Sequence, residues 1–251
     1  MVVPQDMTFT YVNPIRDKEI IAQFRRASEL TDCVFAMVIS KIRDGMSEQN
    51  VQELLDESIH KTASKSGEKI SLSFSIVESG ERTSLLHGRA TERIINKGEF
   101  VTIDFGLNYK DITTDFTRTF VVGKVDKQKY DVYETVKKAF DRALDGIYCG
   151  MTGVQADALS RDVIVKAGYD FKHGLGHGLN GSESNRYHIV TDGIVLDIKD
   201  TKTVLEENMV FTIEPGIYLE NNFGVRIEDT VLLTKSGVER LTRFPYELIE
   251  I

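Results

Sequence analysis

Several features of common protein classes are scarce in this sequence of 251 residues. Its two cysteines, Cys33 and Cys149, are too few for a disulfide framework or for a zinc site built from cysteine. No apolar run approaches the roughly 20 residues that cross a membrane, and the first residues lack the basic-then-apolar pattern of a signal peptide. A net charge of −8 gives no electrostatic reason to expect nucleic acid or a membrane as a partner. We therefore expect a globular cytoplasmic protein.

What the sequence does contain is two copies of one helical pattern. Apolar residues recur at helical spacing over residues 17–44, and Ser47 then stands as the N-cap of a second helix that ends near Gly67. A second helix pair is expected over residues 127–168. A shift of 105 positions aligns the two pairs without a gap, with Phe35 on Phe140, Ile42 on Ile147, and Gly45-Met46-Ser47 on Gly150-Met151-Thr152.

The repeat continues beyond the helices. The first pair is followed by HGRA and TIDFG, and then by a hairpin that leads to a strand holding Asp115. The second pair is followed by HGLGHGL and TIEPG, and then by a hairpin that leads to a strand holding Glu228. This order predicts one α+β domain over residues 1–251, with two pseudo-symmetric halves at about 17–122 and 127–234 and a site between them.

Each expected strand has one apolar face and one polar face that carries a carboxylate. In VTIDFG, side chains point alternately to the two faces of the strand, so Asp104 lies on the face opposite the apolar residues Ile103 and Phe105. The same alternation places Asp115, Glu214 and Glu228 on polar faces. A single acidic residue on a strand is usually solvent-exposed, which is the simplest interpretation of each one. Four carboxylates that share one concave face would repel one another by several kcal/mol. Their duplicated positions therefore favour a divalent cation between them.

Three of the five histidines fall in one glycine-rich stretch, FKHGLGHGLNGSESNRYHIV. Glycine gives His177 the backbone freedom to turn its side chain into a cleft, although a turn or a polar contact would explain a lone histidine. One imidazole and four carboxylates form an oxygen-rich ligand set, which favours Mn²⁺, Co²⁺ or Fe²⁺ and leaves Zn²⁺ open. Five such side chains suit a pair of ions about 3.5–4 Å apart.

These motifs resemble the pita-bread metallopeptidases, and most closely the Xaa-Pro dipeptidases (prolidases) and Xaa-Pro aminopeptidases. The resemblance rests on LLHGRAT, TIDFGLNYKDITTDFTRTF, HGLGHGL, TIEPGIY and FGVRIEDTVLLTKSGVERLT, which are spread over nearly the whole sequence. It implies a curved antiparallel sheet with helices outside it, and two divalent ions, Mn²⁺ or Co²⁺ before Zn²⁺ or Fe²⁺. The metal ligands that it implies are Asp104, Asp115, His177, Glu214 and Glu228.

The same resemblance implies roles for further residues. A hydroxide shared by the two ions would attack the scissile carbonyl, while Glu214 relays protons. His87 and His173 match positions that line the substrate pocket, and Tyr218 and Arg226 match positions beside the metal ions. The implied activity is a hydrolase that removes an N-terminal residue ahead of proline in short peptides. A homodimer stays open.

One segment departs from the prolidase pattern. Prolidases have a second histidine seven residues after the metal histidine, and here Ser184 holds that place. An apparent insertion at NGSES would bring His188 into the same role, which is to bind the substrate carbonyl and stabilise the tetrahedral intermediate. The alternative leaves His188 on a solvated loop. Xaa-Pro peptidases also usually carry a further N-terminal domain, so the sequence is either a natural single-domain member or part of a longer protein.

Three other functions stay open. Methionine aminopeptidases share the ligands and a similar domain size, although EPGIY and GVRIED match the proline-specific branch better. A pita-bread binding module without activity would explain the altered segment after His177, but such proteins usually lose metal ligands and all five remain here. The third open function is hydrolysis of an amide bond in a substrate that is not a peptide. Cleavage of Met-Ala against Xaa-Pro peptides distinguishes the two peptidases.

Overall fold

Two pairs of helices form at equivalent positions of the two halves. They are α1 (Lys18–Ile39) with α2 (Glu48–Ser66), and α3 (Lys127–Gly146) with α4 (Gly153–Lys166). The second helix of each pair begins with a capping box, in which Ser47 pairs with Asn50 and Thr152 with Gln155. The predicted helix pairs and the predicted N-cap at Ser47 are confirmed. The computed structural model describes residues 8–11, 13–179, 188–191, 193–199 and 202–251.

The predicted end of the first helix at Asp44 is wrong, because α1 ends at Ile39. Beyond it, the amide of Gly45 donates to the carbonyl of Ile95 at 2.9 Å and draws the backbone away from the helix axis. Ile42 is nevertheless buried. Because Ile42 is apolar and stands at helical spacing, the sequence pattern extends beyond the residue at which the helix ends in the structure.

Strands of both halves form one eight-stranded sheet, with the order β10-β11-β5-β3-β2 among the described residues. In addition, β9 and β12 pair with β11, and β4 pairs with β3. The strands are β2 (Ile70–Ser79), β3 (Phe100–Tyr109), β4 (Ile112–Thr113), β5 (Phe116–Val121), β9 (Val210–Ile213), β10 (Gly216–Leu219), β11 (Phe223–Thr234) and β12 (Gly237–Arg240). A 3₁₀ turn, η1 (Gly80–Ser84), follows β2. The antiparallel pair β5–β11 joins the halves, with Thr117 opposite Glu228. We propose that the two halves form one domain.

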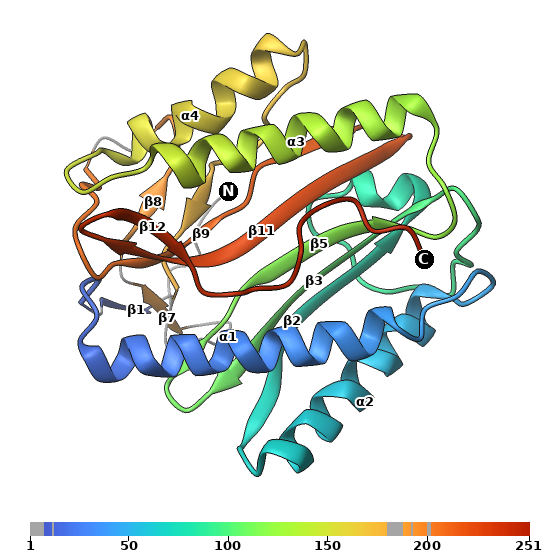
Figure 1. Ribbon diagram of the computed structural model, residues 1–251, viewed down its shortest axis with the longest axis horizontal. Helices are drawn as coiled ribbons and strands as arrows, with labels where there is room; N and C mark the ends of the chain where they lie inside the picture. Colours follow the sequence, from blue (N-terminus) through green and yellow to red (C-terminus); the bar gives the residue numbers. More distant parts are fainter. Residues whose placement is uncertain (1–7, 12, 180–187, 192, 200–201) are drawn as a thin grey trace.

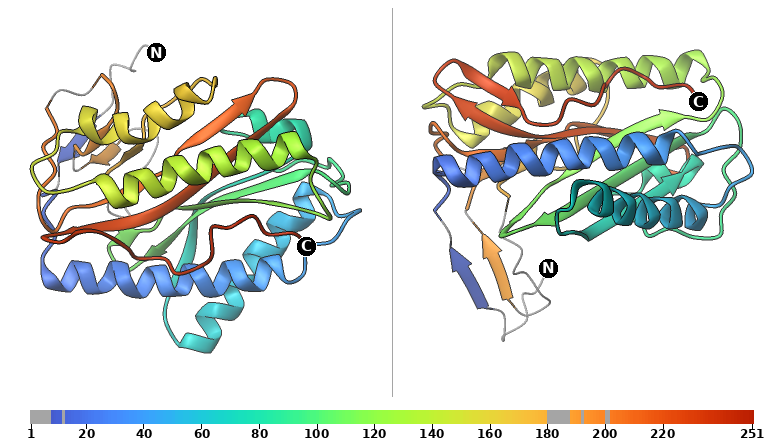
Figure 2. Two further views of the ribbon diagram at one scale, coloured as in Figure 1. Left: turned by 45° about the horizontal axis from the view of Figure 1, so that its top comes forward. Right: turned by 60° about the horizontal axis from the view of Figure 1, so that its bottom comes forward.

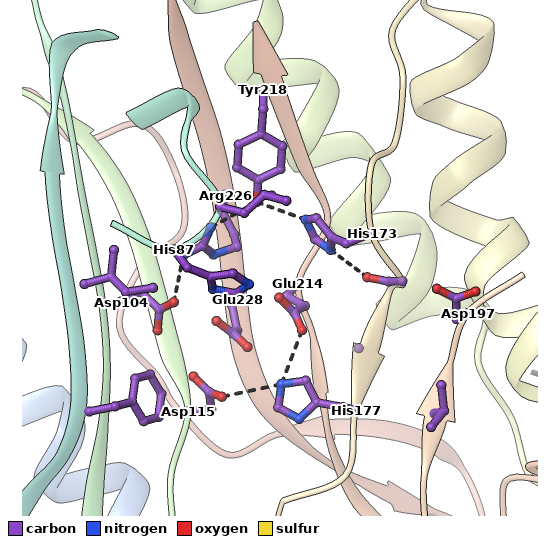
Figure 3. A pocket seen from close by; sticks show the side chains of 16 residues that line it. His87, Asp104, Asp115, His173, His177, Asp197, Glu214, Tyr218, Arg226 and Glu228 are labelled. Carbon is purple, nitrogen blue, oxygen red and sulfur yellow. Dashed lines mark hydrogen bonds and ion pairs between the residues drawn. The ribbon is translucent and has the colours of Figure 1, made fainter. Parts of the chain in front are cut away.

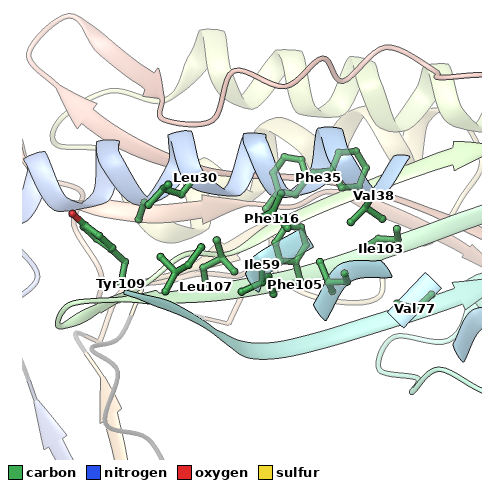
Figure 4. Packing of buried hydrophobic residues seen from close by; sticks show 14 of the residues in the cluster. Leu30, Phe35, Val38, Ile59, Val77, Ile103, Phe105, Leu107, Tyr109 and Phe116 are labelled. Atoms are coloured by element: carbon green, nitrogen blue, oxygen red, sulfur yellow. The ribbon is translucent and has the colours of Figure 1, made fainter. Parts of the chain in front are cut away.

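The helices lie on one face of this sheet, with α1 and α3 directly across it (Figure 1). Figure 4 shows Leu30, Phe35 and Val38 of α1 packed towards Ile103 and Phe105 of β3. Burial of such side chains stabilises the fold by about 1.5–3 kcal/mol each. The apolar faces of the strands therefore pack against the helices, and the polar faces lie on the other side of the sheet.

Two small sheets complete the described structure. β6 (Gly176–His177) pairs with β8 (Val195–Leu196), and β1 (Thr8–Tyr11) pairs in parallel with β7 (His188–Thr191). The right-hand view of Figure 2 shows β1 and β7 as a ribbon that extends away from the helices and the main sheet. Among the described residues, no helix has both the length and the apolar character needed to cross a membrane.

Candidate metal centre

A cavity of about 470 Å³ lies on the polar face of the sheet (Figure 3). Its wall includes all of the predicted site residues except His188, namely His87, Asp104, Asp115, His173, His177, Glu214, Tyr218, Arg226 and Glu228. Phe74, Ile76 and Leu86 add an apolar part of the wall that the sequence motifs did not indicate. Both halves therefore contribute to one cavity, as the duplicated sequence predicts.

The four carboxylates come from two strands and two strand connections, and the two in the connections, Glu214 and Asp115, were both predicted to lie within strands. Asp104 lies on β3, Glu228 on β11, and Glu214 between β9 and β10. Asp115 was expected within a strand, but it lies between β4 and β5. Its amide donates to the Oγ1 atom of Thr230 at 3.3 Å, and its carbonyl accepts from the same hydroxyl at 2.9 Å. The hydroxyl of Thr230 thus makes the backbone hydrogen bonds at Asp115 that a neighbouring strand would otherwise make.

The acidic face is buried rather than solvated. The exposed fractions of Asp104, Asp115 and Glu228 are 7%, 7% and 2%. Burial, with the neighbouring carboxylates, raises the pKa values of Asp115 and Glu228 well above their ordinary values. Burial also raises the pKa of Glu214. Buried acids this close together favour a bound cation, because a cation offsets both their repulsion and their lost hydration.

His177 presents a ring nitrogen to these acids. Its Nδ1 atom lies 3.0 Å from the carbonyl of Gly178, so Nδ1 donates and Nε2 carries the lone pair in the neutral imidazole. The Nε2 atom lies 3.4 Å from Glu214 Oε1 and 3.6 Å from Asp115 Oδ2. This backbone contact is the usual means of orienting a metal-binding histidine. Ligand atoms of Asp115, His177 and Glu228 all lie within 4.8 Å of one another.

The two carboxylate oxygens of Asp104 have different surroundings. Its Oδ2 atom accepts from Nη2 of Arg226 at 2.7 Å, whereas its buried Oδ1 atom has no hydrogen-bond partner among the described residues. A buried carboxylate oxygen without a donor costs about 1–3 kcal/mol or more. Coordination of a cation would satisfy this oxygen. The donor set therefore fits a divalent metal.

A directional chain of hydrogen bonds runs along one side of the cavity. Nη1 of Arg226 donates to the hydroxyl of Tyr218 at 3.0 Å. The Nδ1 atom of His173 lies 2.8 Å from the carbonyl of Gly174 and its Nε2 atom lies 2.9 Å from the Tyr218 hydroxyl. Burial lowers the pKa of His173 to about 4, so the neutral ring donates from Nδ1 and accepts from Tyr218 at Nε2.

The segment after His177 that carries Ser184 and His188 falls largely outside the described residues. Ser184 lies outside the described residues. His188 belongs to β7, but its side chain lies outside the described part of the structure. The role of His188 therefore stays a prediction.

Glu78 is a buried acid beside the cavity wall that the sequence motifs did not indicate. It lies on β2 opposite Thr102, two residues after the cavity residue Ile76, and its side chain is fully buried. A methyl group added at Gly88 would overlap Oε1 of Glu78, so the carboxyl group packs directly beneath the HGRA segment. Burial raises its pKa to about 7. No sequence motif marked this strand, so Glu78 could be found only once the structure had placed Ile76 on the cavity wall.

Glu78→Gln is expected to reduce the pH dependence of stability. Because the pKa of Glu78 is raised to about 7 in the folded protein, its contribution to stability is present at acid pH and is lost as the pH rises through about 7. At pH 8 the unfolding midpoint of the variant should therefore lie at a higher urea concentration than that of wild type. The difference between the two midpoints should shrink towards pH 4. Glu92→Gln, at an exposed position, is the control. A constant difference across this pH range would contradict the prediction.

Comparisons with known proteins agree with this geometry. The family model described as "Metallopeptidase family M24" matches residues 22–235. The chain belongs to this family. As an M24 metallopeptidase, it is 37% identical to the Xaa-Pro dipeptidase of Pyrococcus furiosus over 237 residues, which cover 94% of this chain and 65% of that protein.

Solved structures of M24 proteins show the same fold. The Xaa-Pro dipeptidase from Bacillus anthracis superposes with a TM-score of 0.86 at 40% identity, over 95% of this chain and 64% of that one. The X-Pro aminopeptidase from Thermotoga maritima gives 0.86 at 34% identity, over 95% and 65%. The chain thus spans slightly less than two thirds of the length of these relatives. The predicted α+β pita-bread fold and the predicted family are confirmed.

Proposed function

We propose that this M24 metallopeptidase hydrolyses the bond between an N-terminal residue and proline in short peptides. The observation that carries the proposal is the set of four largely buried carboxylates beside one half-exposed imidazole on the wall of a cavity. The similarity to Xaa-Pro dipeptidases over most of the chain supports the substrate class. The apolar wall at Phe74, Ile76 and Leu86 suits a proline ring. A cytoplasmic location and a homodimer stay predictions.

The donor set fits two divalent cations, for which we propose Mn²⁺ or Co²⁺ before Zn²⁺ or Fe²⁺. The residues that would hold them are Asp104, Asp115, His177, Glu214 and Glu228. When bound, such ions polarise a carbonyl and lower the pKa of water. Because the ligands must be deprotonated, metal affinity should fall at acid pH.

The residues around these ligands have complementary tasks. Glu214 can hold a proton at its carboxylate, because burial raises its pKa. Arg226 keeps its positive charge, since Tyr218 and Asp104 raise its pKa against the effect of burial. It thereby orients Asp104 and supplies a fixed positive charge beside the cavity. We propose that His87 and the neutral His173 contact the substrate, with His173 held in place by Tyr218.

Removal and replacement of metal tests the activity. Protein treated with a chelator should lose hydrolysis of an Xaa-Pro dipeptide and of an Xaa-Pro tripeptide, and Mn²⁺ or Co²⁺ should restore it. Faster cleavage of a Met-Ala peptide would instead indicate a methionine aminopeptidase. Absence of cleavage of all three peptides with any of the four metals would contradict the proposal and favour a binding module or another amide substrate.

His188→Ala tests the predicted substitute for the second histidine of prolidases. If His188 stabilises the tetrahedral intermediate, kcat should fall about a hundredfold or more, with Mn²⁺ affinity unchanged. His60→Ala, on the exposed side of α2, is the control. An unchanged kcat would retain the peptidase and reject the role of His188.

A further inference from the structure

We propose that each half of the fold positions its histidine-glycine loop with one buried carboxylate and one arginine. The first histidine loop is the segment 85–91, which carries His87. The second histidine loop is the segment 171–178, which carries His173 and His177. The inference rests on the proposed function, because that function supplies the roles of these histidines in binding substrate and metal. It assigns positioning roles to four residues outside the site motifs.

The second histidine loop is attached to α4 by Asp157 and Arg161. Arg161 donates from Nη1 to the carbonyl of Phe171 at 2.6 Å and from Nη2 to the carbonyl of His173 at 2.8 Å. Asp157 Oδ1 accepts from the amide of Leu175 at 3.0 Å, and this amide is shared with the carbonyl of Leu196 at 2.7 Å. The two side chains also bind each other, at 2.5 Å and 2.9 Å. The backbone is thus held at three alternate residues, immediately before the imidazole of the candidate metal centre.

The pair has a feature that stability alone does not explain. Asp157 is fully buried and the Arg161 side chain is 19% exposed. Burying such a pair costs desolvation that its mutual attraction often fails to offset. A second pair on the same helix, Asp162 with Lys166, has side chains 67% and 77% exposed, and no hydrogen bond joins it to the loop among the described residues. The buried pair differs in directing its remaining polar groups at the loop backbone.

The first histidine loop is attached to α2 in a similar way. Glu48, fully buried at the start of α2, accepts from the amide of Ser79 at 2.8 Å and from the amide of Thr91 at 3.0 Å. Arg82 donates from Nε to both oxygens of Glu48 at 3.1 Å, and from Nη2 to the carbonyl of Arg89 at 2.7 Å. These bonds hold the backbone on both sides of the loop.

The two attachments do not derive from matching residues. The shift of 105 positions that aligns the helices places Glu48 on Gly153, and it places Gln52 on Asp157. The halves therefore make the same attachment with different side chains. Such an arrangement is expected if the attachment itself serves the cavity between the halves.

The central experiment compares Arg161→Ala with Lys166→Ala, which removes the exposed pair of the same helix. In the Mn²⁺-loaded protein, Arg161→Ala should lower kcat for an Xaa-Pro dipeptide tenfold or more, and weaken Mn²⁺ binding by about 10–100-fold, as for outer partners of metal ligands. Lys166→Ala should change neither. Arg161→Lys keeps the charge but not the planar fork, so it should fold and give an intermediate loss.

The first histidine loop predicts a different pattern, because it carries none of the proposed metal ligands. Glu48→Gln should raise KM severalfold and leave Mn²⁺ affinity unchanged. Glu53→Gln, exposed on the same helix, is its control. Loss of Mn²⁺ affinity in Glu48→Gln as large as in Arg161→Ala would contradict separate roles for the two loops.

Hydrogen exchange of the metal-free protein distinguishes this inference from the proposed function. The amide of Leu175 should exchange at least tenfold faster in Arg161→Ala and Arg161→Lys than in wild type, and at the wild-type rate in Lys166→Ala. This result would support the positioning role even if no Xaa-Pro peptide were cleaved. A lower melting temperature in the Arg161 variants, with Leu175 exchange and Mn²⁺ affinity unchanged, would overturn the inference.

Discussion

Glu228→Gln is expected to abolish peptide hydrolysis and at the same time to raise the thermal stability of the metal-free protein. Burial, with Asp115, Glu214 and Asp104, raises the pKa of Glu228 well above its ordinary value. A carboxyl group with a raised pKa stabilises the folded protein at acid pH, and this contribution is lost as the pH rises through the raised value. The amide is uncharged and can still accept the hydrogen bond that Thr117 donates at 2.5 Å. It therefore relieves repulsion and keeps this contact.

Calorimetry and kinetics across pH check this prediction. The melting temperature of the metal-free variant should exceed that of wild type at pH 8, and the difference should shrink towards acid pH. With Mn²⁺ present the order should reverse, and kcat/KM should fall about a thousandfold or more, because several kcal/mol of transition-state stabilisation depend on the metal. Glu220→Gln removes a charge at an exposed position and should change nothing. A variant that retains activity would exclude Glu228 as a ligand.

Gly176→Ala is expected to be the most damaging change of a residue that carries no functional group. An added methyl group would overlap the backbone carbonyl oxygen of Thr212 and lie 2.7 Å from its carbonyl carbon. Backbone atoms cannot rotate away, so β6 and β9 must separate. This separation would displace His177, whose amide donates to Thr212 Oγ1 at 3.0 Å, and Glu214, whose amide donates to Leu175.

We expect Gly176→Ala to lower stability by about 1–3 kcal/mol and kcat/KM by about a hundredfold, since displacements near 1 Å have such effects. Urea unfolding and peptide hydrolysis measure the two quantities. Gly146→Ala is the control, because its methyl group would meet only the side chain of Leu159 and lies in a helix, where alanine is favoured. Equal effects of the two substitutions would show that the contact with Thr212 is unimportant.

Much of the site could be predicted because its signals are local or repeated. The strand alternation around Asp104 and Glu228 indicates the polar face directly, since neighbouring side chains of a strand point to opposite sides. The duplicated motifs indicate that the halves share one site. The boundary of α1 and the break in the strand at Asp115 could not be obtained in this way. Each depends on a bond to a distant residue, Ile95 and Thr230 respectively.

By itself, the sequence determined the two helix pairs, the α+β class, the family and most of the polar residues that line the cavity. Periodicity, capping residues and motif order specify these features within short segments. Only the tertiary structure decided which polar groups are buried and which atoms they face. Arg226 meets Asp104 across 122 positions of the chain, and Arg161 reaches the carbonyl groups of the second histidine loop. Such contacts depend on how helices and strands pack, because side chains far apart in the sequence meet only after the backbone has folded.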